Sequence, residues 1–312
     1  MNNSINWRPQ KLNDFIGKES LMNDLKTAII ASLQQNKPMD HILFYGYPGV
    51  GKTSLAYALA NELGVQIHLT QGNLLIKTTD ILNLLSLIKE NDIVFIDEIH
   101  SCPSIVLETL YSIMEDFAID VHLGRDLNTK TTRLKIPPFT LIAATTAFGK
   151  IPQPLEERFG HLYYLSEYNK GEMSAIIYHN AKKLNALLNI EDCMLMANYV
   201  KGIPRLAIRL LKRVMDYQFV YPQTSVDEIL KKMQMFDDGL SIEDVHYLQV
   251  LYKHEEEMGL KTLSQILMTD PQTIETKIEP FLLKNQYIIK NLKGRKISAK
   301  GCAFLINNQL QK

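Results

Sequence analysis

The stretch GYPGVGKT at residues 46–53 decides the fold of the first half of the chain. It follows the apolar run His41–Tyr45 and precedes a helical pattern that starts near Lys52, which is the strand-loop-helix context of a phosphate-binding P-loop. Glycines let the backbone curl so that its N–H groups face phosphates, and the helix N-terminus adds partial positive charge. We expect Lys52 to reach the β- and γ-phosphates of a nucleotide and the Thr53 hydroxyl to ligate Mg²⁺.

Apolar strand-like runs alternate with helical patterns around this loop. The runs are His41–Tyr45, Val65–Thr70, Ile93–Ile96, Thr140–Ala144 and His161–Leu165, and the helical patterns cover Leu21–Leu33, Lys52–Leu63, Thr79–Ile88 and Ser104–Phe117. Such alternation is typical of βαβ units. It predicts an α/β domain with a largely parallel sheet over residues 1–168.

Two of these runs end in polar side chains that suit nucleotide hydrolysis. Ile93–Ile96 is followed by Asp97, which could hold Mg²⁺, and by Glu98, which could orient or deprotonate an attacking water. Thr140–Ala144 is followed by Thr145 and Thr146. Ligands gather at the carboxyl ends of parallel strands, so one of these hydroxyls could sense the γ-phosphate or the water. The pattern favours nucleotide hydrolysis over simple nucleotide binding.

The character of the sequence changes after Tyr168. Residues 169–239 show helical periodicity without a convincing strand, and Pro204 lies where the first turn of a helix tolerates proline. Residues 240–312 show short helical patterns and then two strand-like runs, Tyr287–Leu292 and Arg295–Ser298, around a turn at 293–294. Helices followed by a hairpin form the outline of a winged helix. We therefore predict three domains, with boundaries at 168 and 239.

Charge is balanced overall but uneven along the chain. Lys plus Arg equals Asp plus Glu, 34 against 34, so any nucleic-acid site must be a local patch. Residues 281–312 carry seven basic side chains and no acidic one. Basic residues beside a wing turn, such as Lys290, Lys293 and Arg295, suit phosphate contacts, and we expect them to bind DNA without strong sequence preference.

Other global features exclude several classes of protein. No run approaches 18 apolar residues, so we expect no membrane span. The three cysteines lie far apart, without metal-ligand or disulfide spacing, which fits a reducing compartment. The cytoplasm is the expected location.

The order of these motifs resembles that of AAA+ ATPases and, more narrowly, the RuvB family of bacterial Holliday-junction branch-migration motors. The resemblance extends over nearly the whole chain. It is carried by residues 7–9, 14–17, 40–56, 95–100, 114–117, 137–146, 158–160 and 202–213, together with the winged-helix outline at the C-terminus. The fold this implies is an AAA+ P-loop domain, a small helical lid and a winged-helix domain.

The resemblance assigns nucleotide-binding and catalytic roles to matching positions. Adenine-side contacts are implied for Trp7, Arg8 and Tyr168, phosphate contacts for Gly49, Gly51, Lys52, Thr53 and Ser54, and further nucleotide contacts for Glu115, Asp116 and Phe117. Thr146 resembles the first sensor, with Thr145 as second choice, and Arg205 resembles the second sensor. Arg158 matches the arginine finger that reaches the ATP of a neighbouring subunit. Glu98, Arg158, Thr146 and Arg205 are thus the expected catalytic set, with Thr53 and Asp97 on Mg²⁺.

The implied function is an ATP-driven hexameric ring that moves four-way junction DNA in recombination and repair. The segment His122–Arg133 matches in position the family's hairpin that docks a RuvA-type partner. Lys290 and Arg295 match in position the DNA-contacting basic residues of the family's winged-helix domain, and we expect both on the exposed tip of the C-terminal hairpin. The chain departs from the family at Tyr47, Ser101, Ala147, Glu156 and Glu157, and two of these changes remove positive charge near a subunit boundary.

Two other functions fit the P-loop. A clamp-loader or remodelling ATPase would share the fold, but the DNA-binding end argues against it. An ATP-gated switch, such as a replication initiator, would recognise one duplex sequence and turn over rarely. Sequence-blind, salt-sensitive DNA binding favours the motor, whereas a preferred sequence would favour the switch.

Overall fold

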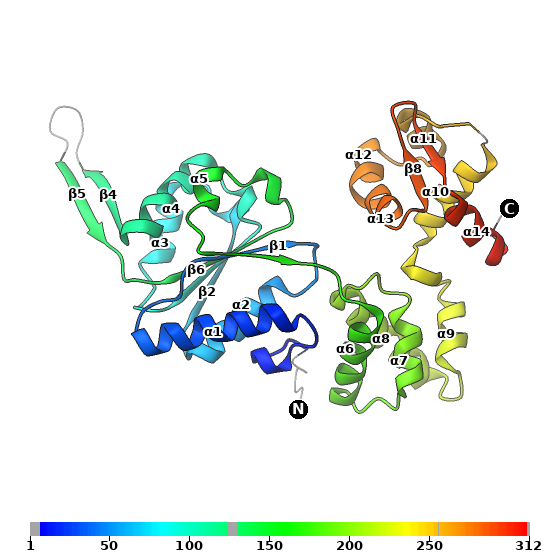
Figure 1. Ribbon diagram of the computed structural model, residues 1–312, viewed down its shortest axis with the longest axis horizontal. Helices are drawn as coiled ribbons and strands as arrows, with labels where there is room; N and C mark the ends of the chain where they lie inside the picture. Colours follow the sequence, from blue (N-terminus) through cyan, green and yellow to red (C-terminus); the bar gives the residue numbers. More distant parts are fainter. Residues whose placement is uncertain (1–6, 124–129, 255, 311–312) are drawn as a thin grey trace. The chain divides into compact units, whose positions relative to one another are not determined.

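The computed structural model describes residues 7–123, 130–254 and 256–310 (Figure 1). The chain forms two compact units, one of residues 1–197 and 202–212 and the other of residues 198–201 and 213–312. The division between them falls within helix α8 (Pro204–Val220). The boundaries at 168 and 239 remain a prediction.

The first unit is built on a parallel sheet of five strands in the order β2-β3-β6-β1-β7. The strands are β1 (Ile42–Gly46), β2 (Ile67–Gln71), β3 (Ile93–Asp97), β6 (Thr140–Thr145) and β7 (His161–Leu165). Each coincides closely with a predicted run, and the predicted α/β class is confirmed. The order brings the ends of β1, β3 and β6 together, because β3 and β1 flank β6.

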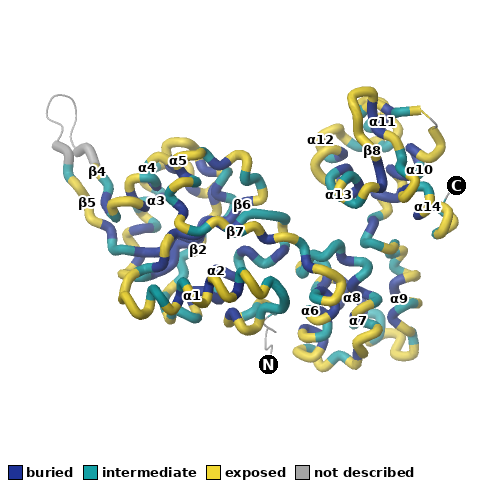
Figure 2. Tube along the Cα trace, in the orientation of Figure 1, coloured by how far each residue is buried: buried dark blue, intermediate teal, exposed yellow. Residues whose placement is uncertain are grey.

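Helices cover both faces of this sheet (Figure 1). They are α1 (Glu19–Gln35), α2 (Lys52–Leu63), α3 (Thr78–Leu85), α4 (Ser104–Asp116) and α5 (Gln153–Glu156). Because side chains alternate along a strand, Phe44 and Phe95 pack on the face of α1 and α2, whereas Leu43 and Val94 pack on the face of α3 and α4. The central strands are therefore buried on both sides, as a parallel sheet requires (Figure 2).

A two-stranded hairpin extends away from the sheet (Figure 1). Strands β4 (Ala118–Leu123) and β5 (Lys130–Lys135) pair antiparallel, with Ala118 opposite Lys135. This is the position of the hairpin expected from the resemblance. Its residues 124–129 lie outside the described residues.

The helical region after Tyr168 contains α6 (Lys170–Lys183), α7 (Ile190–Ala197), α8 and α9 (Val226–Lys232). Asn169 caps α6, since its side chain accepts a hydrogen bond from the Glu172 N–H. Helix α8 begins at Pro204, as predicted from the tolerance of a first turn for proline. Short 3-10 turns connect several elements: η1 (Leu12–Asp14), η2 (Gly72–Leu74), η3 (Ile99–Ser101), η5 (Phe148–Lys150) and η6 (Asp237–Gly239).

The C-terminal part of the second unit is a winged helix. It comprises α10 (Ile242–Lys253), α11 (Leu260–Ile266), α12 (Pro271–Thr273), the π-helical turn η7 (Ile274–Ile278), α13 (Glu279–Lys284), β8 (Ile288–Lys290), β9 (Arg295–Ile297) and α14 (Ala299–Asn307). The predicted helices and hairpin are confirmed, and α14 is an element that the sequence pattern did not indicate. Apolar residues of α10, α11, α13 and α14, including Leu248, Leu263, Leu282 and Leu305, form its core.

Within the described ranges, every helix is too short or too polar to cross a lipid bilayer.

Candidate active site

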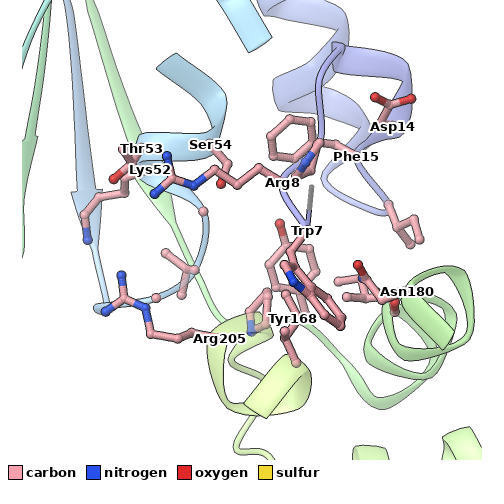
Figure 3. A pocket seen from close by; sticks show the side chains of 18 of the residues that line it. Trp7, Arg8, Asp14, Phe15, Lys52, Thr53, Ser54, Tyr168, Asn180 and Arg205 are labelled. Atoms are coloured by element: carbon pink, nitrogen blue, oxygen red, sulfur yellow. Dashed lines mark hydrogen bonds between the residues drawn. The ribbon is translucent and has the colours of Figure 1, made fainter. Parts of the chain in front are cut away.

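A cavity of about 360 Å³ lies beside the P-loop in the first unit (Figure 3). Its walls come from the N-terminal segment, the P-loop, the end of β3, Tyr168 and the helices α6 and α8. The lining residues are Trp7, Arg8, Pro9, Asp14, Phe15, Ile16, Pro48–Ser54, Asp97, Glu98, Tyr168, Ile176, His179, Asn180, Lys183, Pro204, Arg205 and Ile208. The adenine-side and P-loop residues predicted from the sequence thus meet Asp97, Glu98 and Arg205 in one place.

The P-loop depends on glycine at the positions where the backbone turns most sharply. Gly49 and Gly51 have φ of 83° and 114°, a region that side chains disfavour. A Cβ atom on Gly49 would lie 3.0 Å from the Arg205 Cβ, so the loop can approach α8 closely only without one. Gly51 then caps α2, whose first residue is Lys52.

The Lys52 side chain is held inside this loop. Its Nζ donates hydrogen bonds to the carbonyls of Gly46, at 2.8 Å, and Tyr47, at 2.9 Å. Burial lowers the pKa of Lys52, an effect that the nearby carboxylates of Glu98 and Asp97 oppose. Because Tyr47 contributes a backbone carbonyl, the departure from the family at this residue leaves the contact in place.

The carboxylates at the end of β3 lie in different surroundings. Burial and the neighbouring Glu98 raise the pKa of Asp97, although its Oδ1 accepts the Glu98 N–H at 3.1 Å. Glu98 has φ 49° and ψ 51°, a left-handed conformation that is uncommon outside glycine and is often retained at functional sites. In this conformation the Glu98 side chain is directed toward the end of β6.

Thr146 meets Glu98 at that point. The Glu98 carboxylate accepts hydrogen bonds from the Thr146 N–H, at 2.9 Å, and from the Thr146 hydroxyl, at 3.0 and 3.1 Å. Thr145 is fully buried, and its hydroxyl accepts the Ala147 N–H at 3.0 Å. Of the two threonines, Thr146 therefore contacts the acidic pair directly. It does not line the cavity itself.

His100 is a neighbour of Glu98 that sequence reasoning did not single out. Its Nδ1 lies 3.2 Å from Glu98 Oε2 and 2.9 Å from Thr145 Oγ1. Because a carboxylate oxygen cannot donate, a hydrogen on Nδ1 is the arrangement that avoids repulsion here. The sequence signal available was only that His100 follows the acidic pair closely, on the next turn of the chain.

The aromatic end of the cavity is stabilised by cations. Lys212 Nζ lies 4.3 Å from the centre of the Trp7 ring, and the Arg8 guanidinium lies 5.1 Å from that of Tyr57. Tyr168 is buried, which raises the pKa of its hydroxyl. Trp7, Arg8 and Tyr168 line the cavity, and their contacts with adenine remain a prediction.

Arg158 and the segment Glu115–Phe117 do not line the cavity of their own chain. Arg158 Nη2 lies 3.0 Å from Glu115 Oε1, its Nη1 donates to the Pro154 carbonyl, and its guanidinium lies 5.0 Å from the Tyr111 ring centre. Asp116 pairs with Arg133. Arg158 and Glu115, two of the residues predicted to contact a nucleotide, thus contact each other outside the cavity.

The wing corrects one expectation. Arg295 is buried, with 7% of its surface exposed, rather than on an exposed tip. It donates to Glu279 at 2.7 Å and to Glu275 at 3.0 Å, while Lys290 lies 3.1 and 3.2 Å from the Glu275 and Glu279 carboxylates. Although burial opposes ionisation, hydrogen bonds from Arg295 and Lys290 keep the pKa of Glu279 below its usual value. Both glutamates lie just before the acid-free segment at 281–312, so the charges of that segment alone did not predict that its cations would form ion pairs.

Lys293 remains at the turn of the wing and is exposed. The Asn291 side chain accepts the N–H groups of Lys293 and Gly294 at 2.9 and 3.0 Å, which fixes the turn. Arg295 also exchanges backbone hydrogen bonds with Met258 at 2.8 and 2.9 Å. The wing is therefore anchored along its base. Of the predicted DNA residues, Lys293 and Lys290 are exposed, and Lys290 is the one that pairs with Glu275 and Glu279.

The buried ion pair between Arg295 and Glu279 predicts that a substitution of Arg295 will affect stability. Arg295→Ala should lower the free energy of unfolding by about 3 kcal/mol, because the buried Glu279 would lose its closest cation and keep only Lys290 as an ion-pair partner. Chemical denaturation of the full chain measures this, and Lys293→Ala, an exposed change on the same hairpin, is the control. Arg295→Met combined with Glu279→Met should recover much of the loss. Unchanged stability in Arg295→Ala together with weaker DNA binding would show instead that Arg295 serves DNA.

Comparison with known proteins agrees with this architecture throughout the chain. Residues 7–165 match the Holliday junction DNA helicase RuvB P-loop domain, residues 168–239 the RuvB AAA lid domain, and residues 237–306 the RuvB C-terminal winged helix domain. The RuvB subunit of the Holliday junction branch migration complex of Ureaplasma urealyticum is 54% identical over 313 residues, covering both chains fully. That of Mycoplasma genitalium is 40% identical and covers 96% of this chain and 97% of its own.

Solved structures show the same likeness in three dimensions. The Holliday junction branch migration motor RuvB of Thermotoga maritima is 33% identical, with a TM-score of 0.81 over 96% of this chain and 98% of its own. A mutant form of that protein gives 34% identity and a TM-score of 0.82 over the same shares. The chain therefore belongs to the RuvB family.

Proposed function

We propose that this chain is an ATP-driven motor that promotes branch migration of Holliday junctions in recombination and repair. It acts as a hexameric ring on duplex DNA, with a RuvA-type protein bound at the junction, and it works in the cytoplasm. The observation that carries the proposal is the cavity that joins the P-loop, Asp97, Glu98 and Arg205 in a chain similar over its full length to branch-migration subunits. The predicted domains 1–168, 169–239 and 240–312 supply ATPase, lid and DNA-binding head.

The cavity suits ATP with Mg²⁺. Thr53 at the start of α2 and Asp97 at the end of β3 offer the hard oxygen ligands that Mg²⁺ prefers. When bound, Mg²⁺ neutralises charge on the phosphate oxygens. Lys52 would exchange its two loop carbonyls for phosphate oxygens, and Gly49, Gly51 and Ser54 would present backbone N–H groups. Trp7, Arg8 and Tyr168 would enclose the base.

Hydrolysis rests on Glu98, which would take a proton from the attacking water. Thr146 would orient Glu98 through the hydrogen bonds that it donates, in keeping with a sensor at the end of β6. Arg205 lines the same cavity at the start of α8 and would report from the lid on the subunit's own ATP. These are the chain's contributions in cis.

Arg158, Glu115, Asp116 and Phe117 would act in trans. They lie outside their own cavity, so a contact with ATP requires a neighbouring subunit. Guanidinium groups stabilise charge that develops on the transferred phosphoryl group, whether they come from the same or a second subunit. Ser101, Ala147, Glu156 and Glu157, where the family usually has other residues, would tune contacts between subunits.

One prediction concerns His100 as a positioning residue. His100→Ala should lower kcat by about tenfold and leave KM for ATP unchanged, because the Thr145-bonded ring whose Nδ1 lies 3.2 Å from Glu98 Oε2 would no longer hold that carboxylate in place. His100→Asn, whose amide nitrogen can occupy the place of Nδ1, should retain most of the activity. Steady-state ATPase kinetics measure both values. Equal losses in the two variants, or a change in KM alone, would exclude this role.

A second prediction concerns DNA. Lys293→Ala should flatten the slope of log affinity against log salt by about 0.9, because one phosphate contact releases one counterion. The effect should be the same for all duplex sequences. Fluorescence anisotropy with labelled duplexes at several salt concentrations measures it, and Lys277→Ala serves as a control on an exposed lysine outside the wing. Loss on a single sequence would support the initiator-like switch.

The decisive test of the proposed function is dissociation of a synthetic four-way junction. We expect ATP-dependent dissociation that a RuvA-type partner stimulates, and no activity in Lys52→Ala. ATP hydrolysis without junction dissociation under either condition would refute the branch-migration motor and favour a clamp-loader-type or switch-type ATPase.

A further inference from the structure

A buried amide on α6 has an unused hydrogen-bond acceptor at the nucleotide cavity. Asn180 lines the cavity and is only 6% exposed. Its Nδ2 donates to the Ile176 carbonyl at 2.8 Å, but no group among the described residues donates to its Oδ1. An unsatisfied buried acceptor costs stability, so its presence in a binding cavity calls for a partner that arrives with the ligand.

The orientation of this amide follows from chemistry. The Ile176 carbonyl can only accept a hydrogen bond, so the amide nitrogen must be the group that faces it. The oxygen therefore points away from the backbone of α6. Exchanging the two atoms would place two acceptors 2.8 Å apart, which is unfavourable.

Asn180 lies at the end of the cavity away from the phosphate loop. Figure 3 shows Lys52 and Thr53 on one side of the cavity and Asn180 on the other, with Trp7 and Tyr168 between them. The apolar side chains of Ile16, Ile176 and Ile208 also line the cavity. With phosphates at the P-loop, the group that reaches Asn180 is the base.

We propose that Asn180 is a specificity-determining residue whose Oδ1 accepts a hydrogen bond from the 6-amino group of adenine. This rests on the proposed function, in which the cavity binds ATP. The 6-amino group is the only N–H donor of the adenine base in ATP. Guanine and hypoxanthine carry an oxygen acceptor at the same position, which would face Oδ1 without a shared hydrogen. Asn180 thus selects ATP over GTP.

The experiment compares nucleotide analogues that differ at this one position. Calorimetric titration uses diphosphates to avoid turnover: ADP, purine riboside diphosphate, which lacks the 6-substituent, and IDP, which has an oxygen there. The parent protein should bind ADP about tenfold more tightly than the purine analogue, as the loss of one hydrogen bond predicts, and IDP more weakly still.

Substitution then assigns the preference to the side chain. Asn180→Leu, which is nearly isosteric, should reduce ADP affinity to that of the purine analogue while leaving the analogue's own affinity unchanged. Asn180→Ser provides a smaller variant if the leucine variant does not fold. Asn23→Leu makes the same change at an exposed position of α1 outside the cavity and should preserve the parent's preference.

Several outcomes would overturn the inference. Equal binding of ADP and the purine analogue by the parent protein would do so without any variant. A preference for ADP that survives in both Asn180 variants would assign the contact with the 6-amino group to another residue. Weaker binding of 2′-deoxy-ADP than of ADP that disappears in Asn180→Leu would move the Asn180 contact to the ribose. Failure of the proposed nucleotide site is distinguishable, because then Lys52→Ala would leave the affinity for every diphosphate unchanged.

Discussion

Glu98→Gln should bind ATP almost as tightly as the parent chain and hydrolyse it about 10²–10⁴-fold more slowly, the usual contribution of a general base. The amide cannot take up the proton of the attacking water. It keeps an oxygen that can accept the Thr146 N–H, so the local structure should persist. Nucleotide titration gives the affinity, and phosphate release at saturating ATP gives the rate.

Lys52→Ala is the contrasting variant. Removal of its ammonium takes away the positive charge nearest the expected phosphates, so affinity itself should fall. Glu90→Gln, a change of an exposed glutamate outside the cavity, should alter neither quantity. Equal loss of ATP affinity in Glu98→Gln and Lys52→Ala would contradict the separate roles of the two residues, because both would then act only in binding.

The features that could be predicted from the sequence are those that local physics determines. The strands of the parallel sheet are short apolar runs because both of their faces are buried, as Phe44 and Leu43 show on opposite sides of β1. The P-loop has glycine wherever φ is positive, so the backbone geometry of the loop could be predicted from the positions of its glycines. The cavity follows, because the ends of β1 and β3 both lie beside β6.

The features that could not be predicted depend on partners distant in the sequence. In the sequence, Arg295 resembles a DNA-contacting residue. In the structure, Glu279, which lies sixteen residues earlier, binds Arg295 in the core. His100 is informative only because the end of β6 brings Thr145 to its Nδ1. Asn180 lies in a helical pattern with nothing to distinguish it, and its significance lies in the group that it does not contact.

Arg158→Ala should leave the ATP affinity of each subunit nearly unchanged and reduce hydrolysis by about 10³–10⁵-fold, the range observed for arginine fingers. The geometric reason is that Arg158 lies with Glu115 and Tyr111, outside the cavity of its own chain. Its ion pair involves a Glu115 side chain that is 58% exposed, so loss of the pair itself should cost little stability. Calorimetry and phosphate release measure the two effects.

Mixed rings then test whether the residue acts on a neighbour. A Lys52→Ala subunit cannot hydrolyse ATP but still carries Arg158, so it can complete the site of an Arg158→Ala subunit beside it. In an equal mixture about a quarter of all sites combine an intact Lys52 with an intact neighbouring Arg158, because ring interfaces pair unlike surfaces. Turnover should therefore recover to about that fraction of the parent rate. The double variant, mixed with either single variant, supplies no such site and controls for changes in assembly. Rings that assemble normally by light scattering yet show no recovery at any ratio would place the action of Arg158 within its own subunit.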